Sequence, residues 1–200
     1  MNLDFIEKIT RETILDYFPE LEQTLHTLEN NICHDQESVF NHTMQVFKNC
    51  KEVMISSSVI ESYFKIVITD NPKSVLFLLA VLFHDISKTF TIKTLDGETS
   101  CPGHELKSSE IFHKVFEDKL SSDELIYIED IIKRHADISK LLDHMETFDR
   151  EITKLQNENR LELFIFSLAD FYNGNLERSN KDKYDLRVSA LRKAINMSIA

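Results

Sequence analysis

The stretch VLFHDISKTF places a histidine and an aspartate, His84 and Asp85, directly after the apolar run of residues 75–83. A carboxylate beside a buried apolar run costs several kcal/mol unless it is paired with a positive group or coordinates a metal ion. Imidazole nitrogens and carboxylate oxygens are ligands that divalent metals accept. The pair therefore predicts a compensating partner, and the rest of the chain has to supply it.

Four further candidate ligands lie on expected helices, and about 100° of rotation per residue gives their orientation. His135 continues the apolar stripe of its helix, Asp170 ends another stripe, and His42 lies beside the edge of a third. His104 shares a face with apolar residues, whereas His113 lies on the opposite side of the same helix and is interpreted as an ordinary histidine.

Each candidate also has a plain explanation. A single inward-facing histidine is more often a core residue bonded to a carbonyl than a metal ligand. The metal interpretation depends on the whole set, because a core without a metal has to neutralise each member separately. The candidate metal ligands are His42, His84, Asp85, His104, His135 and Asp170.

The composition indicates how these residues are held. The chain has 200 residues, 42% of them hydrophobic and 14 of them phenylalanine, which is ample for a sizeable core. Only 3 glycines and 3 prolines leave little turn chemistry for hairpins, and Leu, Ile, Glu and Lys recur at helical spacing. We expect an all-α fold, a compact multi-helix bundle, formed by one domain over residues 1–200 with its motif-bearing core at about 37–175.

Several local signals mark the helices. Residues 75–83 are apolar on every side, so their helix should lie in the middle of the bundle. Capping boxes at Ser58 and Ser121 start two others, and Asn71-Pro72 starts the central one. Helices are expected at about residues 3–18, 20–30, 37–55, 58 onward, 71–84, 104–120, 121–136, 139–148, 160–171 and 182 onward.

Helical periodicity disappears over residues 88–103. This segment predicts a loop or a short hairpin around Asp96-Gly97. Loops of this length inside a domain are often functional. A second break, Asn173-Gly174, is expected to close the helix that carries Asp170.

The net charge and the cysteines limit the classes of protein to which the chain can belong. A net charge of -11 without clustered Lys and Arg argues against an extended nucleic-acid surface. Cys33, Cys50 and Cys101 have no paired spacing, which favours reduced thiols in the cytoplasm. The N-terminus does not look like a signal peptide, and the longest apolar run is far below the ~20 residues that a membrane span needs.

The order of the candidate ligands, a histidine, a His-Asp pair, two more histidines and an aspartate, resembles the HD superfamily of metal-dependent phosphohydrolases over about residues 40–173. The stretches LFHDISK and DGETSCPGHE are similar to the HD domain attached to bacterial tRNA nucleotidyltransferases. No Gly-rich strand with paired aspartates precedes the bundle, so nucleotide addition is not implied. Ser87 stands where that family usually has glycine.

The resemblance implies a ligand set and a division of roles. His42, His84, Asp85 and Asp170 bind a divalent metal, with Mn, Fe, Co, Ni or Mg as candidates. In members with two ions, Asp85 bridges them, and the second ion is bound by His104 and His135. In members with one ion, these two histidines face the substrate phosphate instead.

Lys88 has two interpretations. It lies one helical turn beyond His84 and carries a charge suited to a phosphate, or it complements the dipole at a helix C-terminus. Arg134 has the same ambiguity, with the solvated interpretation favoured. Glu105 either orients His104 or a water, or complements a helix N-terminus. The expected catalytic residues are Asp85, Lys88, His104 and His135.

The resemblance implies hydrolysis of a nucleotide, a cyclic nucleotide or another small phosphate ester by a metal-activated water. One alternative is an HD-type di-iron oxygenase, which the same ligands permit. Another is a binding module for a metal or nucleotide without turnover. Fold similarity alone does not identify the substrate, and the sequence predicts no oligomeric state.

Overall fold

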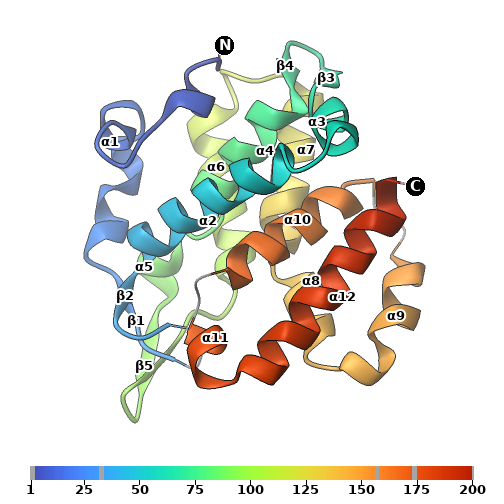
Figure 1. Ribbon diagram of the computed structural model, residues 1–200. Helices are drawn as coiled ribbons and strands as arrows, with labels where there is room; N and C mark the ends of the chain where they lie inside the picture. Colours follow the sequence, from blue (N-terminus) through green and yellow to red (C-terminus); the bar gives the residue numbers. More distant parts are fainter. Residues whose placement is uncertain (1–2, 32–33, 156–157, 173–174, 200) are drawn as a thin grey trace.

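The computed structural model describes residues 3–31, 34–155, 158–172 and 175–199. Helices form most of this part of the chain, so the predicted all-α bundle is confirmed (Figure 1). Cys33 and the expected helix end at Asn173-Gly174 lie outside the described residues.

The central helix is α4 (Lys73–Phe83), and every residue from Ser74 to Phe83 is buried. It packs against α2 (Val39–Met54) and α7 (Ser122–Arg134), as expected for a helix that is apolar on all sides. The longer stretch Lys73–Thr91 is apolar enough to cross a membrane, but 83% of its most apolar window is buried inside the protein. It is therefore explained as a core helix.

The remaining helices surround this centre. Helix α6 (His104–Phe116) packs on α7, and α10 (Arg160–Phe171) packs across α2. Helix α12 (Lys181–Ile199) lies against α10 in the outer part of the bundle (Figure 1). Shorter helices complete the described chain: α3 (Ser58–Phe64), α5 (Lys88–Thr91), α8 (Asp137–Leu142), α9 (Met145–Lys154) and α11 (Asn175–Ser179).

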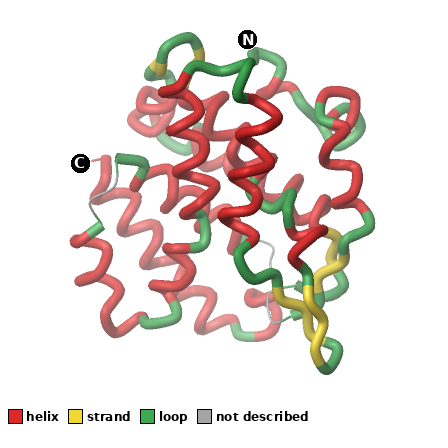
Figure 2. The backbone as a smooth tube through the Cα atoms, turned by 180° about the vertical axis from the view of Figure 1, so that it is seen from behind, coloured by secondary structure: helices red, strands yellow, loops and turns green. Residues whose placement is uncertain are grey.

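Strands in the described residues form three two-stranded antiparallel hairpins, two of which lie together at one end of the molecule (Figure 2). These two are β1 (Leu28–Glu29) with β2 (Glu37–Ser38), and β5 (Lys93–Leu95) with β6 (Glu98–Ser100). Asn30 joins them, since its N–H donates to Thr99 Oγ1 and its carbonyl accepts from the Thr99 N–H, both at 2.7 Å. The third hairpin pairs β3 (Val67–Ile68) with β4 (Asn71–Pro72).

The hairpin expected within residues 88–103 is present. Asp96 and Gly97 connect β5 to β6 with φ angles of 52° and 87°, the left-handed values that a two-residue hairpin turn requires. Residues 88–91 differ from the expectation, because they form the short helix α5 before the hairpin begins.

The two long helices predicted for residues 3–30 are wrong. The chain forms short turns instead: the 3-10 helices Ile6–Lys8 and Pro19–Leu25, with α1 (Ile14–Tyr17) between them. Ile9 is extended, and the Thr10 N–H bonds to Thr13 Oγ1 at 3.1 Å instead of to a helical carbonyl. The apolar residues of the segment are nevertheless buried in the core: Leu3, Ile6, Ile9, Ile14, Phe18 and Leu21.

Helices α2, α3 and α7 begin at serine caps, whereas the cap predicted at Asn71 is not made, because α4 begins after Pro72 without a side-chain cap. The capping box at Ser121 is present, and α10 has the predicted bounds. At α3 the capping side chain is Ser57, not Ser58, because Ser57 Oγ accepts from the Ile60 N–H at 3.2 Å. The helix predicted at 139–148 is divided into α8 and α9, since the Leu142 end of α8 is followed by a turn before Met145.

Candidate metal centre

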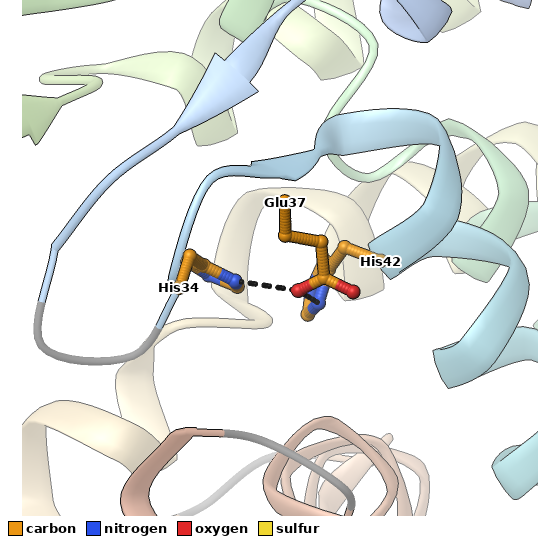
Figure 3. Close-up of side chains that lie close together, drawn as sticks. All are labelled: His34, Glu37 and His42. Atoms are coloured by element: carbon orange, nitrogen blue, oxygen red, sulfur yellow. Dashed lines mark hydrogen bonds and ion pairs between the residues drawn. The ribbon is translucent and has the colours of Figure 1, made fainter.

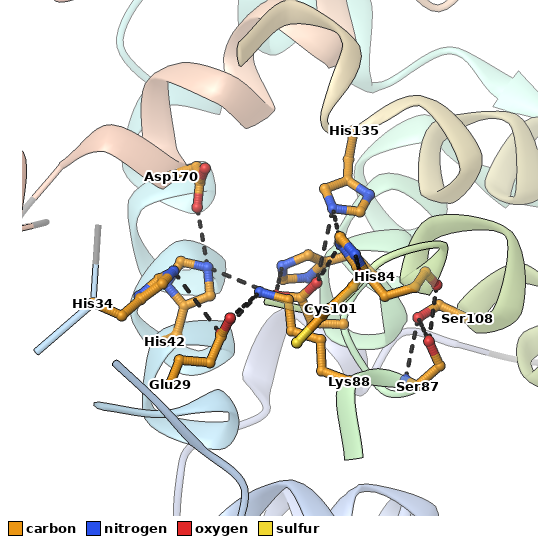
Figure 4. A network of polar contacts seen from close by, with 12 residues as sticks. Glu29, His34, His42, His84, Ser87, Lys88, Cys101, Ser108, His135 and Asp170 are labelled. Carbon is orange, nitrogen blue, oxygen red and sulfur yellow. Dashed lines mark hydrogen bonds and ion pairs between the residues drawn. The ribbon is translucent and has the colours of Figure 1, made fainter. Parts of the chain in front are cut away.

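Five helices bring all six candidate ligands together, and Figure 4 labels four of them: His42, His84, His135 and Asp170. The central pair, His84 and Asp85, follows the last residue of α4, where the buried helix ends inside the bundle. Helix α2 carries His42, α6 begins at His104, His135 follows the last residue of α7, and Asp170 lies near the end of α10.

Asp85 lies at the centre of this cluster and is 1% exposed. Its Oδ2 is 2.9 Å from His84 Nε2 and 3.9 Å from His42 Nε2. Its Oδ1 is 3.2 Å from His104 Nε2 and 3.8 Å from His135 Nε2. The two carboxylate oxygens therefore face two groups of ligand atoms, each compact enough to hold a metal ion.

The ring protons of three histidines are held away from Asp85. Each of these rings has its Nδ1 at 2.7 Å from the backbone carbonyl three residues earlier, in the pairs His84–Val81, His104–Cys101 and His135–Ile132. A carbonyl can only accept, so Nδ1 carries the proton and the Nε2 of each neutral ring carries a lone pair. The three lone pairs converge on a carboxylate.

This arrangement fits a metal ion. Among the described residues, Asp85 Oδ1 is a buried oxygen with no hydrogen-bond donor. His104 Nε2 and His135 Nε2 are 3.2 Å apart, although the hydrogen bonds at their Nδ1 atoms leave neither Nε2 with a proton in the neutral ring. Acceptors without donors repel one another unless a cation lies between them. Histidines that donate their second N–H to carbonyls are also typical of metal sites.

The pKa values of the cluster follow from burial and from the neighbouring charges. Burial opposes ionisation of Asp85, but the charges of His84 and Lys88 hold its pKa well below the ordinary value. Burial and the neighbouring His84 lower the pKa of His135 to about 3, so this ring is neutral at physiological pH. At His104 the burial effect is outweighed by the contact with Asp85, which raises its pKa.

Lys88 is buried among carboxylates. Its ammonium donates to both oxygens of Glu29, at 3.0 and 2.8 Å, and lies 2.9 Å from Asp85 Oδ2. The residue is the first of the four-residue helix α5, and its contact with a substrate phosphate stays a prediction. Burial lowers the pKa of this ammonium, but the two carboxylates outweigh burial and raise it.

Three polar residues beside the centre were not expected from the sequence: His34 and Glu37 (Figure 3) and Glu29 (Figure 4). His34 and Glu37 follow the last expected helix position, 30, and Glu29 lies in strand β1, where a helix was predicted. His34 Nδ1 is 3.1 Å from Glu37 Oε2, and Glu37 Oε2 is 3.9 Å from His42 Nδ1. The available signal was a histidine and two carboxylates shortly before His42.

The remaining polar residues have structural roles. Ser87 ties the His84-Asp85 turn to α6, because its hydroxyl donates to the His104 carbonyl at 2.8 Å. Arg134 pairs with Asp137 at the surface, as expected, and Glu105 contacts both His104 and Lys140. His113 is half-exposed and pairs with Glu129 outside the centre.

No protein-family model matches this chain, and no curated protein matches it. Its function therefore has to be argued from the residues of the centre. The buried His and Asp groups around Asp85 can hold a metal ion.

Proposed function

We propose that the chain is a metal-dependent phosphohydrolase of the HD type that cleaves a small phosphate ester, such as a nucleotide or a cyclic nucleotide. The observation that carries the proposal is the convergence of three Nε2 lone pairs on Asp85 with no donor for its Oδ1. The order of these residues along the chain, which resembles the HD superfamily, supports the same conclusion.

The residues divide between two positions. Asp85 Oδ2 with His84 and His42 would hold one ion, with Asp170 beside His42 at 3.0 Å. Asp85 Oδ1 with the two remaining histidines, His104 and His135, would hold a second. Nitrogen and carboxylate ligands together favour Mn, Fe, Co or Ni over a closed structural zinc site, and Mg is the weaker candidate.

A bound divalent ion supplies two effects, a lower pKa for a water molecule and polarisation of a phosphoryl oxygen. The chain supplies orientation, because the Nδ1–H groups of His84, His104 and His135 are fixed on carbonyls and the rings cannot turn without losing them. The side chains of His104 and Asp170 are 15% and 34% exposed, whereas that of His84 is 1% exposed. A substrate would therefore approach from the side of His104 and Asp170.

A di-iron oxygenase is the second candidate. Two groups of ligands that share the carboxylate of Asp85 also suit a pair of iron ions. This candidate predicts oxygen consumption by the iron-loaded protein, whereas the phosphohydrolase needs no redox change.

The test is metal analysis of the purified protein together with a phosphoester panel. The chelator-stripped protein should be inactive on p-nitrophenyl phosphate, bis-p-nitrophenyl phosphate and nucleotides, and Mn, Co, Ni, Fe(II) or Mg should restore activity. His113→Ala is the matched control, because it removes a histidine outside the centre. Activity that survives complete chelation would overturn the proposal, and so would stoichiometric metal binding without any phosphoester cleavage.

A further inference from the structure

His42 is held differently from the other three histidines of the centre. In the described chain, its Nδ1 has no backbone carbonyl at hydrogen-bond distance, whereas the other three rings each have one at 2.7 Å. Its Nε2 faces the centre, 3.0 Å from Asp170 Oδ1 and 3.9 Å from Asp85 Oδ2. A ring that binds an ion through Nε2 must carry its proton on Nδ1, and that proton needs an acceptor.

Glu37 is the group placed to accept this proton. Its Oε2 is 3.9 Å from His42 Nδ1, whereas Asp85 and Asp170 lie at Nε2, and Figure 3 shows Glu37 next to the His42 ring. Glu37 belongs to β2, which leads directly into α2, and Ser38 caps that helix by accepting from the Asn41 N–H at 3.2 Å. The hairpin and the cap therefore hold the backbone between Glu37 and His42, and a hydrogen bond to Nδ1 requires the carboxylate to move closer than 3.9 Å.

His34 holds Glu37 in this position. The His34 Nδ1 is 3.1 Å from the same Oε2 of Glu37, and its ring packs edge-on against the His42 ring with centroids 4.6 Å apart. The side chains of His34 and His42 are only 12% and 9% exposed. The Glu37 side chain is 34% exposed, and its contact with His34 anchors the carboxylate beside the buried His42 ring.

A separate ion between His34, Glu37 and His42 is the competing interpretation, since their ligand atoms lie close enough together. It would require His42 to give one nitrogen to each of two ions and thus to lose its remaining ring proton. Donation of that proton to a carboxylate keeps the ring neutral, and carboxylate–histidine–metal arrangements are common. The geometry favours the carboxylate as a proton acceptor over a third ligand group.

We propose that Glu37 is a positioning residue for His42: it accepts the Nδ1–H, directs Nε2 toward the centre, and is itself anchored by His34. The inference rests on the metal centre of the proposed function. Loss of such an acceptor lowers metal affinity about 10–100-fold. Glu37→Ala should therefore weaken binding by this factor, and Glu37→Gln, which keeps an accepting oxygen, should weaken it less.

The experiment titrates Co²⁺ into chelator-stripped wild type, Glu37→Ala and Glu37→Gln, and follows the visible absorption and the number of ions per chain. Glu129→Ala is the matched control, because it removes a carboxylate from a histidine outside the centre, His113. Long-range ¹H–¹⁵N spectra of the Zn²⁺-loaded protein report which nitrogen of His42 carries the proton. The expected result is the order wild type, Gln, Ala in affinity, unchanged binding by Glu129→Ala, and a protonated Nδ1 in the wild type.

Equal Co²⁺ affinity of wild type and Glu37→Ala would overturn the positioning role while leaving the metal centre intact. Loss of one whole ion in Glu37→Ala, with unchanged affinity for the others, would overturn it in favour of a separate ion site. A wild type that binds no Co²⁺ would overturn the proposed function as well. Thermal unfolding without metal shows whether each variant is folded. If Glu37→Ala does not fold, the Co²⁺ affinities of wild type and Glu37→Gln are compared instead.

Discussion

Replacement of Lys88 by methionine should strongly destabilise the metal-free protein. The ammonium is 7% exposed and lies within 3.0 Å of three carboxylate oxygens, two from Glu29 and one from Asp85. Lys88→Met fills a similar volume but leaves two buried carboxylates without their cation. Removal of one partner from a buried ion pair costs about 3–5 kcal/mol. A chain of this size loses about 2–4 °C in Tm per kcal/mol, so Tm should fall by about 6–20 °C.

Thermal unfolding of chelator-treated protein, followed by circular dichroism, measures this effect. Lys140→Met is the matched control, because the Lys140 ammonium also lies 3.0 Å from a carboxylate, that of Glu105, but its side chain is 65% exposed. An exposed pair contributes at most about 1 kcal/mol. In a Lys88→Met/Glu29→Gln double variant, the Glu29 charge is also removed, so the Tm should be higher than in Lys88→Met alone.

Added Mn²⁺ or Co²⁺ should raise the Tm of Lys88→Met more than that of the wild type, because a divalent ion next to Asp85 replaces the missing charge. If the Tm of Lys88→Met in metal-free buffer lies within about 2 °C of the Tm of Lys140→Met, the reasoning is refuted, because the carboxylates then tolerate the loss of their cation. Kinetic effects of Lys88 variants have to be measured under conditions where the folded fraction is known.

Three further predictions concern the centre itself. Asp85→Ala should lose its metal and its hydrolytic activity, and stoichiometric metal in that variant, by elemental analysis, would contradict the site. His104→Ala and His135→Ala should each reduce turnover far more than Tm; wild-type activity in both would make them ordinary core histidines. The pKa of His135 is about 3 in the folded protein against 6.5 when unfolded, so the unfolded chain takes up this proton first as the pH falls. The free energy of unfolding of the metal-free protein, measured by denaturant titration, should therefore fall from about pH 6.5 downward. The free energy of unfolding of His135→Gln should fall less over the same range. An equal fall in both proteins would contradict the burial of this ring.

The parts of the structure that the sequence predicts well are those with long apolar periodicity. The run at residues 75–83 fixes a buried α4, and helical rotation alone places His135 and Asp170 on the inward faces of α7 and α10. His42 at the edge of its stripe also points inward, and it is buried. Regular helices carry the orientation of a side chain over many residues, so the six candidate ligands could be selected before their distances were known.

Segments without such periodicity could not be predicted. Lys88 was placed by extending the helical rotation from His84, but residues 84–87 form turns, so that rotation no longer applies. Its position depends on Glu29, which is far away in the sequence and belongs to a two-residue strand. Glu37 pairs with Glu29 in the same hairpin, and His34 lies between its strands. Backbone pairing holds this polar segment, which has no apolar stripe to orient its side chains.

The charges around the centre indicate how many ions an anionic substrate requires. The described carboxylates that contact the cluster, besides Asp85 itself, are those of Glu29, Glu37, Asp170 and Glu105, and the Lys88 ammonium lies among them. The charge of Glu105 is paired with the Lys140 ammonium at 3.0 Å. The other four carboxylates against the one ammonium of Lys88 leave a net negative charge that a single divalent ion does not cancel, whereas two divalent ions reverse its sign. A phosphate ester is repelled by the first state and attracted by the second. Because Asp85 presents one oxygen to each ligand group, the form with two ions is the one expected to bind a phosphate ester productively.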